Sequence, residues 1–311
     1  MSETARMLAL LNETFPDLTR MAPEDARRAA DARIRPAAAD KAVNAEDVTV
    51  DAGTHRLEVR VYRPHVTAPD APVTVYAHGG GFLHGSIIGH DGFCRRWAQS
   101  TGGTVVSVEY RVSTQAPPPA ARDDLVTAVR WAQQAALADN GVILAGDSSG
   151  GNLAAGAAIV LRDLGETPVV GQALLYPFLD PTMSTESHRT RATGYFVTDA
   201  LLSYYWQVYV GAGREPADAA ADADVTPLAI ADLTGLPPAV VVTAGLDPLC
   251  DEGIQYASRL RAAGVPVVER HYPGQFHGFL TIPDYGPASS ASEVLWADLR
   301  HLSHTLTKES R

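Results

Sequence analysis

Long hydrophobic runs are missing from this chain of 311 residues. No apolar stretch approaches the roughly 20 residues that a membrane-spanning helix needs, so we expect no membrane span. The opening residues also lack the charged head, the continuous apolar core and the small-residue cleavage site of a secretory signal. These two absences predict a cytoplasmic protein.

Cysteine and basic residues are also scarce. Cys94 and Cys250 are the two cysteines, and their spacing matches no metal-binding motif, so we expect two free thiols in a reducing compartment. The chain has 25 basic and 36 acidic residues, a formal net charge of −11, and its basic residues are spread along the sequence. Phosphate binding needs a clustered basic surface, so we expect no nucleic-acid partner.

Hydrophobic patterning divides the chain into four parts. Residues 1–45 are predicted to be helical, and residues 46–180 alternate strand-like with helical runs. Residues 181–230 break this rhythm, and residues 231–311 resume it. The alternation predicts an α/β domain, a mostly parallel sheet with helices on both faces. The Ala/Asp-rich section of the 181–230 insertion could form a disordered loop. A small helical cap above the sheet is favoured, because the aromatic residues of the insertion are dense enough to pack.

The expected elements are defined by their residue ranges. The predicted strands are 48–50, 57–62, 73–77, 105–110, 142–145, 169–176, 240–243 and 266–271. The predicted helices after residue 45 are 92–100, 122–138, 152–164, 252–263 and 290–303.

One motif carries most of the chemical information. Gly146-Asp147-Ser148-Ser149-Gly150 follows a predicted strand and precedes a predicted helix. Glycines two before and two after Ser148 allow a turn so tight that the hydroxyl projects from the end of the sheet. The helix that follows points free amides and its positive dipole end toward that hydroxyl. The motif predicts a nucleophile, although a serine there could also be a simple helix N-cap.

A serine hydroxyl needs a base to remove its proton, and the base needs an acid to orient it. In one known chain order the acid and then the histidine follow the serine, each on a loop after a strand. Asp247 follows the predicted strand 240–243, and His277 follows the predicted strand 266–271.

Other residues compete for these two roles. Asp251 or Glu252 could replace Asp247 as the acid, and His271 is the alternative to His277. Asp247 is favoured because it lies at the end of its strand, whereas His271 is expected to end a strand itself.

A glycine run completes the set. His78-Gly79-Gly80-Gly81 ends another predicted strand, and consecutive glycines let backbone amides turn toward the charge that forms on an attacked carbonyl oxygen. With these motifs in view, residues 45–305 closely resemble the hormone-sensitive lipase-like branch of the α/β-hydrolases. That family carries HGGG and GDSAG motifs, with an aspartate in a DPL-type segment and a histidine in an HGF-type segment.

The resemblance implies a role for each motif. Ser148 would be the nucleophile, His277 the general base and acid, and Asp247 its orienting partner. The oxyanion hole would use the amides of Gly80, Gly81 and Ser149. The resemblance also implies an α/β-hydrolase fold whose cap combines the N-terminal helices with the insertion.

The aromatic residues of the cap region admit two interpretations. Phe82, Tyr195 and Phe196 are the candidate substrate contacts. Large aromatics normally bury themselves, so packing within the cap is the alternative for Tyr195, Phe196 and the run Tyr204-Tyr205-Trp206.

No metal or cofactor is expected. His78, His84 and His90 recur every six residues, but the glycines between them make a fixed ligand face unfavourable. The glycine-rich segment also lacks the lysine of a phosphate-binding loop and the third glycine of a dinucleotide motif.

The predicted function is a serine carboxylesterase that hydrolyses short- to medium-chain esters through an acyl-enzyme intermediate. An amidase or lactonase with the same triad is the alternative, and a non-catalytic ligand-binding protein of the same fold is a further one. The partner is a small-molecule ester. The resemblance also suggests a homodimer formed through the edge strand near Val265 to His271.

Overall fold

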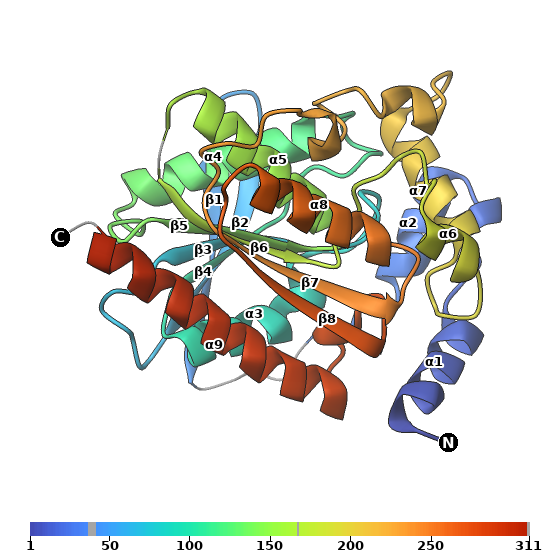
Figure 1. The fold of residues 1–311 in the computed structure, drawn as a ribbon, viewed down its shortest axis with the longest axis horizontal. Coiled ribbons are helices and arrows are strands. Elements are labelled where there is room, and N and C mark those ends of the chain that lie inside the picture. Colours follow the sequence, from blue (N-terminus) through green and yellow to red (C-terminus); the bar gives the residue numbers. More distant parts are fainter. Residues whose placement is uncertain (37–41, 167, 310–311) are drawn as a thin grey trace.

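An eight-stranded sheet forms the centre of the computed structural model, which describes residues 1–36, 42–166 and 168–309 (Figure 1). The strand order is β1-β2-β4-β3-β5-β6-β7-β8. The strands are β1 (Val43–Asp51), β2 (Arg56–Pro64), β3 (Val73–Ala77), β4 (Val105–Val108), β5 (Val142–Asp147), β6 (Val169–Leu175), β7 (Ala239–Leu246) and β8 (Val267–Phe276). β2 is antiparallel to both β1 and β4, and the remaining neighbours are parallel. The predicted mostly parallel sheet is confirmed.

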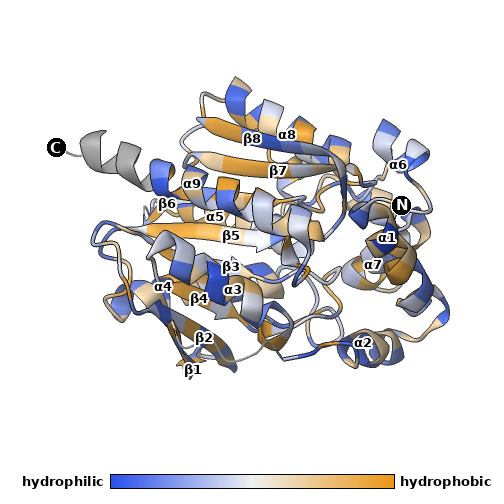
Figure 2. Ribbon diagram, turned by 90° about the horizontal axis from the view of Figure 1, so that it is seen from below, coloured by the Kyte–Doolittle hydropathy of each residue, from blue (hydrophilic) through white to orange (hydrophobic). Residues whose placement is uncertain are grey.

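Helices cover both faces of the sheet (Figure 1). α3 (Ile87–Thr101) and α9 (Gly286–Glu309) lie on one face, and α4 (Ala120–Gln134), α5 (Ser149–Asp163) and α8 (Cys250–Ala262) lie on the other. Every residue of β3, β4 and β5 is therefore buried. Strands covered on both sides are expected to be largely hydrophobic, and Figure 2 shows the hydrophobic colour over most of β5 and the first part of β7. The predicted α/β architecture is confirmed.

A cap of short helices lies at the carboxyl end of the parallel strands (Figures 1 and 2). It contains α1 (Glu3–Thr14), η1 (Leu18–Arg20), α2 (Pro23–Asp31), α6 (Glu186–Thr190) and α7 (Asp199–Val210). The side chain of Asn12 donates to the Gly194 carbonyl and accepts from the Phe196 amide, while the Tyr204 hydroxyl donates to the Met21 carbonyl. These bonds join the N-terminal helices to the insertion across about 180 residues of sequence.

Short 3₁₀ helices complete the connections. They are η2 (Pro216–Ala219), η3 (Pro227–Ala229) and η4 (Phe279–Thr281). η2 lies in the Ala/Asp-rich part of the insertion, where Arg214 pairs with Asp222 and Arg122 pairs with Asp224. The N-terminal end of α4, a helix of the core, thereby contacts the insertion.

The end of β8 differs from the sequence prediction in a way that concerns the site. β8 continues to Phe276, beyond the predicted end at residue 271, because β7 pairs with it as far as Leu246. The extended strand includes Pro273, which an edge strand tolerates because one side of its backbone is unpaired. The extension brings the end of β8 next to the end of β7.

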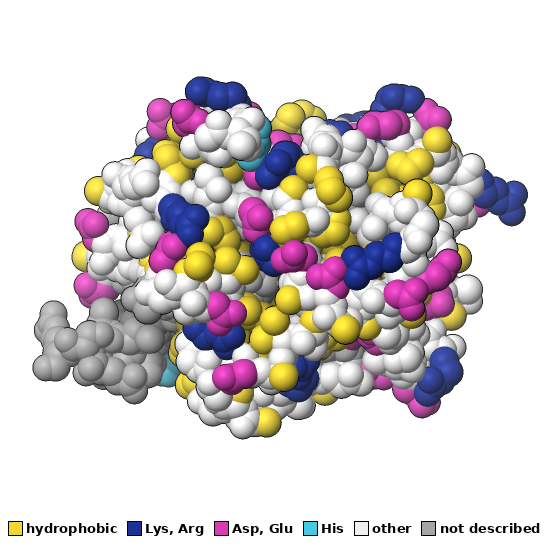
Figure 3. All heavy atoms as spheres, turned by 90° about the horizontal axis from the view of Figure 1, so that it is seen from above, with side chains coloured by type: hydrophobic (Ala, Val, Ile, Leu, Met, Phe, Trp, Pro, Cys, Tyr) yellow, Lys and Arg dark blue, Asp and Glu magenta, His cyan; other side chains and the backbone are white. Residues whose placement is uncertain are grey.

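Acidic and basic side chains are interspersed on the face shown in Figure 3, with small hydrophobic areas between them. Across the described residues, no helix combines the length and the hydrophobicity that crossing a bilayer requires.

Candidate active site

Ser148 lies on a tight turn between β5 and α5. Its backbone has a φ of 57° and a ψ of −123°, a conformation that a non-glycine residue adopts only when its surroundings hold it there. Close packing explains the flanking glycines. A Cβ on Gly146 would lie 2.3 Å from the Gly150 backbone, and a Cβ on Gly150 would lie 2.1 Å from the Ala77 carbonyl oxygen. The strand-to-helix elbow therefore needs glycine at both positions.

The imidazole of His277 lies between the other two candidate catalytic groups. Its Nε2 is 2.8 Å from the Ser148 Oγ, and its Nδ1 is 2.8 Å from the Asp247 Oδ2. Asp247 directly follows β7 and His277 directly follows β8, so the pairing of these two strands brings both loops together. The arrangement permits a proton to pass from the serine to an imidazole whose orientation the carboxylate fixes.

The competing residues have other partners. Asp251 accepts a hydrogen bond from the Ser187 amide, and Glu252 faces His188. His271 lies on β8, with its Nδ1 3.0 Å from the Thr243 Oγ1. None of these three contacts includes the nucleophile elbow.

Burial and charge act in opposite directions on the base. Burial disfavours the imidazolium form of His277, but the Asp247 carboxylate outweighs this effect and raises the pKa of His277 above its ordinary value. Ser148 and His277 are only 8% and 6% exposed, so the reacting groups are largely shielded from water. In such surroundings fixed hydrogen-bond donors stabilise charge more strongly than they would in water.

The glycine loop after β3 leaves several amides unpaired beside the elbow. The Gly80 carbonyl accepts from the amides of Leu83 and His84, which closes a turn. Across the part of the chain that the structure describes, the amides of Gly80, Gly81 and Ser149 have no hydrogen-bond acceptor. Three free donors at this place fit an oxyanion hole.

A buried carboxylate lies beneath that loop. Asp147 accepts from the Tyr76 hydroxyl at 2.6 Å and from the Gly79 amide at 2.8 Å, both through Oδ1, and His90 Nε2 lies 3.2 Å from the same oxygen. Burial raises the pKa of Asp147, but His90 and the other donors outweigh this and lower it below its ordinary value. Burial lowers the pKa of His90, yet Asp147 raises it overall, which favours the protonated imidazole beside the carboxylate.

The three regularly spaced histidines have different surroundings. The His78 ring stacks on Tyr110 with centroids 4.3 Å apart, and His84 Nε2 lies 2.7 Å from the Tyr205 hydroxyl. His90 faces the carboxylate beneath the loop. The described residues contain no group of three His, Cys, Asp or Glu side chains that could hold a metal ion.

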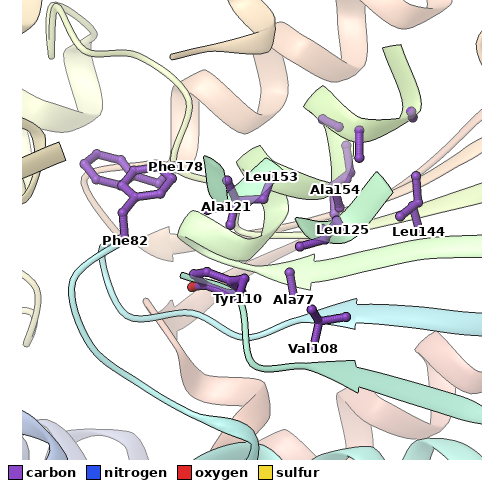
Figure 4. Close-up of a cluster of buried hydrophobic side chains, with 14 of the residues drawn as sticks. Ala77, Phe82, Val108, Tyr110, Ala121, Leu125, Leu144, Leu153, Ala154 and Phe178 are labelled. Atoms are coloured by element: carbon purple, nitrogen blue, oxygen red, sulfur yellow. The ribbon is translucent and has the colours of Figure 1, made fainter. Parts of the chain in front are cut away.

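Phe82 lies under the cap and is fully buried. Its ring stacks on Tyr209 of α7, with centroids 3.9 Å apart. The Phe178 ring lies 5.8 Å away, and Figure 4 shows Phe82 and Phe178 side by side at one end of the hydrophobic cluster. Phe82 is one of the predicted substrate contacts, and in this structure its ring is covered by the cap. Its packing joins the end of the glycine loop to the cap.

The other two predicted substrate contacts are half-buried. Phe196 packs edge-on against Phe15 of the N-terminal segment, with centroids 5.3 Å apart. Phe196 and Tyr195 both border the hydrophobic cluster on the α3 and α9 side of the sheet. These residues therefore retain some exposed surface at the junction of the two cap segments.

The first helix of the insertion is fastened to the loop that carries Asp247. The Ser187 hydroxyl donates to the Pro248 carbonyl at 2.6 Å and accepts from the Asp251 amide at 3.1 Å. The Arg191 Nε donates to the Gly245 carbonyl at 3.0 Å. α6 thereby holds this loop on both sides of the candidate catalytic acid.

A fully buried glutamate strengthens this connection. Glu252 Oε2 accepts from the amides of Leu179 and Asp180, where the insertion begins, and Oε1 faces His188 Nε2 at 3.0 Å. His188 Nδ1 in turn lies 2.7 Å from Asp199 at the start of α7. Glu252, His188 and Asp199 therefore link α8 of the core to both helices of the inserted cap. We name them the cap tether.

Sequence patterns had not identified several of these residues. Asp147 carried a signal, because a charged residue ends an otherwise apolar strand. His188 carried none, since its partner Glu252 lies 64 residues away.

Comparisons with known proteins agree with this geometry. The sequence model of a family described as having the alpha/beta hydrolase fold matches residues 74–281. The chain belongs to this family. The resemblance stated from the motifs is thereby confirmed.

This α/β-hydrolase is 36% identical over 301 residues to "Carboxylesterase NlhH" of Mycobacterium tuberculosis, an alignment covering 91% of each chain. It also resembles the crystal structure of the Ser161Ala mutant of LAE6, an alpha/beta hydrolase enzyme from the metagenome of Lake Arreo, Spain. There the TM-score is 0.88, the identity 32%, and the coverage 97% of this chain and 98% of that one. "Gibberellin receptor GID1B" of Arabidopsis thaliana is 34% identical over 239 residues, covering 74% of this chain and 66% of the receptor.

Proposed function

We propose that this α/β-hydrolase is a serine carboxylesterase in which Ser148, His277 and Asp247 form the catalytic triad. The 2.8 Å contact between His277 Nε2 and the Ser148 Oγ carries the proposal, because it places the base where it can remove the serine proton. The esterase names among its relatives favour ester substrates.

The reaction is a two-step acyl transfer. The Ser148 oxygen attacks the ester carbonyl carbon as His277 takes its proton, and the amides of Gly80, Gly81 and Ser149 stabilise the oxyanion. His277 then protonates the departing alcohol. Water, activated by the same histidine, hydrolyses the acyl-enzyme and restores the serine. No metal or cofactor takes part in these steps.

Replacing the nucleophile tests this mechanism. Ser148→Ala is expected to lower kcat on p-nitrophenyl acetate by a factor on the order of 10⁴ or more, because the acyl-enzyme can no longer form. Circular dichroism should show an unchanged fold. If the folded variant hydrolysed the ester at a near-normal rate, the proposed nucleophile would be wrong.

A ligand-binding role, suggested by the plant receptor among the relatives, has less support. A binding protein has no need for a serine held in a strained elbow beside a correctly oriented imidazole and free amides. Measurable turnover of the ester by the wild-type protein would exclude a purely binding role.

The substrate is proposed to carry a short or medium acyl chain. The reacting hydroxyl is only 8% exposed, and the aromatic residues of the cap pack closely above the glycine loop. Tyr195 and Phe196, at the junction of the cap segments, are the proposed substrate contacts. A series of p-nitrophenyl esters from acetyl to palmitoyl should show kcat/KM falling steeply toward the long chains.

The remaining features of the proposal concern organisation. Residues 1–45 and 181–230 would form the cap, and residues 46–180 and 231–311 the core, as the bonds between the two cap segments support.

Cys94 and Cys250 are free, which favours a reducing compartment such as the cytoplasm. β8 ends the sheet, so its outer edge could pair with a second copy. Light scattering that reports only monomer would exclude this homodimer.

A further inference from the structure

We infer that Asp147 is a positioning residue for the oxyanion hole, in which its carboxylate fixes the glycine loop relative to the nucleophile through the Gly79 amide. This inference rests on the proposed function, since it assigns a task within the same site.

The bond joins the two halves of the site directly. Asp147 immediately precedes Ser148, and its Oδ1 accepts from the Gly79 amide at 2.8 Å. Gly79 immediately precedes Gly80, whose amide is one of the proposed oxyanion donors. The Asp147 side chain therefore sets the distance between the attacking oxygen and the donors. The bonded residues, Asp147 and Gly79, are the direct chain neighbours of the nucleophile and of the first donor.

The fit between the two residues is close. A Cβ added to Gly79 would lie 2.5 Å from Asp147 Oδ2, which is shorter than any ordinary contact. The loop can approach the carboxylate this closely only because glycine stands at this position.

Further hydrogen bonds hold the rest of the loop without using the amides proposed as oxyanion donors. The Tyr110 hydroxyl donates to the His78 carbonyl at 2.7 Å, and the Gly80 carbonyl closes the turn with Leu83 and His84. The bonds on the loop thus engage the groups around the oxyanion donors and leave the donors themselves free.

Two further groups hold the carboxylate itself. The Tyr76 hydroxyl donates to the same Oδ1 at 2.6 Å, and the Nε2 of His90 on α3 lies 3.2 Å from that oxygen. Asp147 is 4% exposed, so its orientation depends on these contacts rather than on water. A preorganised donor array stabilises an oxyanion because it needs no rearrangement during the reaction.

The test compares two variants of Asp147 with one variant of another buried carboxylate. Asp147→Ala removes the acceptor for the Gly79 amide. Asp147→Asn keeps an Oδ1 that can accept from both Gly79 and Tyr76 while removing the charge. Asp91→Ala is the matched control, because Asp91 is another buried carboxylate that accepts from a tyrosine, Tyr62. Its other partners among the described residues are Arg60 and Arg95 rather than the glycine loop.

The expected results separate positioning from general stability. Asp147→Ala should lower kcat on p-nitrophenyl acetate by about 100-fold, the scale of losing one oxyanion donor, with KM changed less than about threefold. The affinity for a trifluoromethyl ketone, whose adduct places a negative oxygen in the hole, should fall by a similar factor. Asp147→Asn should stay within about fivefold of wild type on both measures. Asp91→Ala should lower the melting temperature without changing kcat per folded molecule.

Two outcomes would overturn the inference. One is a folded Asp147→Ala variant whose kcat per folded molecule resembles that of Asp91→Ala. The other is an Asp147→Asn variant as impaired as the alanine variant, which would assign the effect to charge. If the alanine variant does not fold, hydrogen exchange of the Gly79 amide in the wild-type protein decides, because an unprotected amide contradicts the bond. Retained activity of Ser148→Ala would instead refute the proposed function, so the two failures are distinguishable.

Discussion

Glu252→Ala should destabilise the protein more than the loss of a surface charge would, because Glu252 is the centre of the cap tether. The side chain is fully buried and accepts three donors, the amides of Leu179 and Asp180 and the imidazole of His188. The alanine variant leaves all three donors without an acceptor in a site that water does not reach.

The size of the effect follows from those donors. An unsatisfied buried donor costs about 1–3 kcal/mol, and breaking a buried charged pair by removing one partner costs about 3–5 kcal/mol. We therefore expect a loss of about 3–5 kcal/mol of unfolding free energy. With an unfolding entropy of about 2.1 cal/mol/K per residue, this corresponds to a fall of about 5–8 °C in Tm.

Glu252→Gln should behave differently, because one oxygen remains for the two amides. Burial raises the pKa of Glu252 to about 7, against the opposing effect of His188. Burial lowers the pKa of His188, but Glu252 and Asp199 raise it overall to about 8 from 6.5. A histidine whose pKa is higher in the folded than in the unfolded protein stabilises the fold fully at pH values below the unfolded-state pKa. This stabilisation is lost as the pH rises through the folded-state pKa. The stability that His188 contributes is therefore lost between pH 6.5 and about 8, and it amounts to about 2 kcal/mol of unfolding free energy.

Thermal unfolding at pH 6 and pH 9 measures both effects. The wild type should lose the His188 contribution between these pH values, whereas Glu252→Gln should change much less, so the gap between the two narrows at pH 9. Glu166→Ala is the control, since Glu166 forms a partly exposed pair with Arg130 that should contribute at most about 1 kcal/mol. If Glu252→Ala melted within about 1.5 °C of Glu166→Ala, the tether argument would be refuted.

Three further predictions concern the site and the thiols. The raised pKa of His277 means that kcat/KM should fall as pH drops through a value above 6.5, where the base becomes protonated; a rate that stays flat from pH 5 to 8 would contradict this. Gly150→Ala should yield little folded, active enzyme, because the added Cβ would overlap the Ala77 carbonyl at 2.1 Å; normal expression and activity would show that the elbow can relax. Burial raises the pKa of Cys250 to about 12, so an aromatic disulfide reagent should react with it only after unfolding, and rapid labelling of the native protein would argue against the packing around α8.

The nucleophile elbow, the order of the triad and the glycine loop were predictable from sequence because each is a local pattern. Backbone geometry within a few residues requires the glycines beside Ser148 and in the loop after residue 77. The hydrophobic pattern of each strand and helix likewise indicates which of its residues are buried. The predicted α/β architecture was confirmed for the same reason. Helix and strand ends were less predictable, because pairing between distant strands extended β8 to the histidine loop.

The tertiary structure decided which of several chemically similar residues takes each role. Asp247, Asp251 and Glu252 are all carboxylates within six positions, yet they face His277, Ser187 and His188 respectively. Phe82 became a packing residue because a cap helix more than 120 positions later covers it. Sequence placed the candidate catalytic groups after successive strands, whereas their partners depended on hydrogen bonds and packing between segments that meet only when the whole chain has folded.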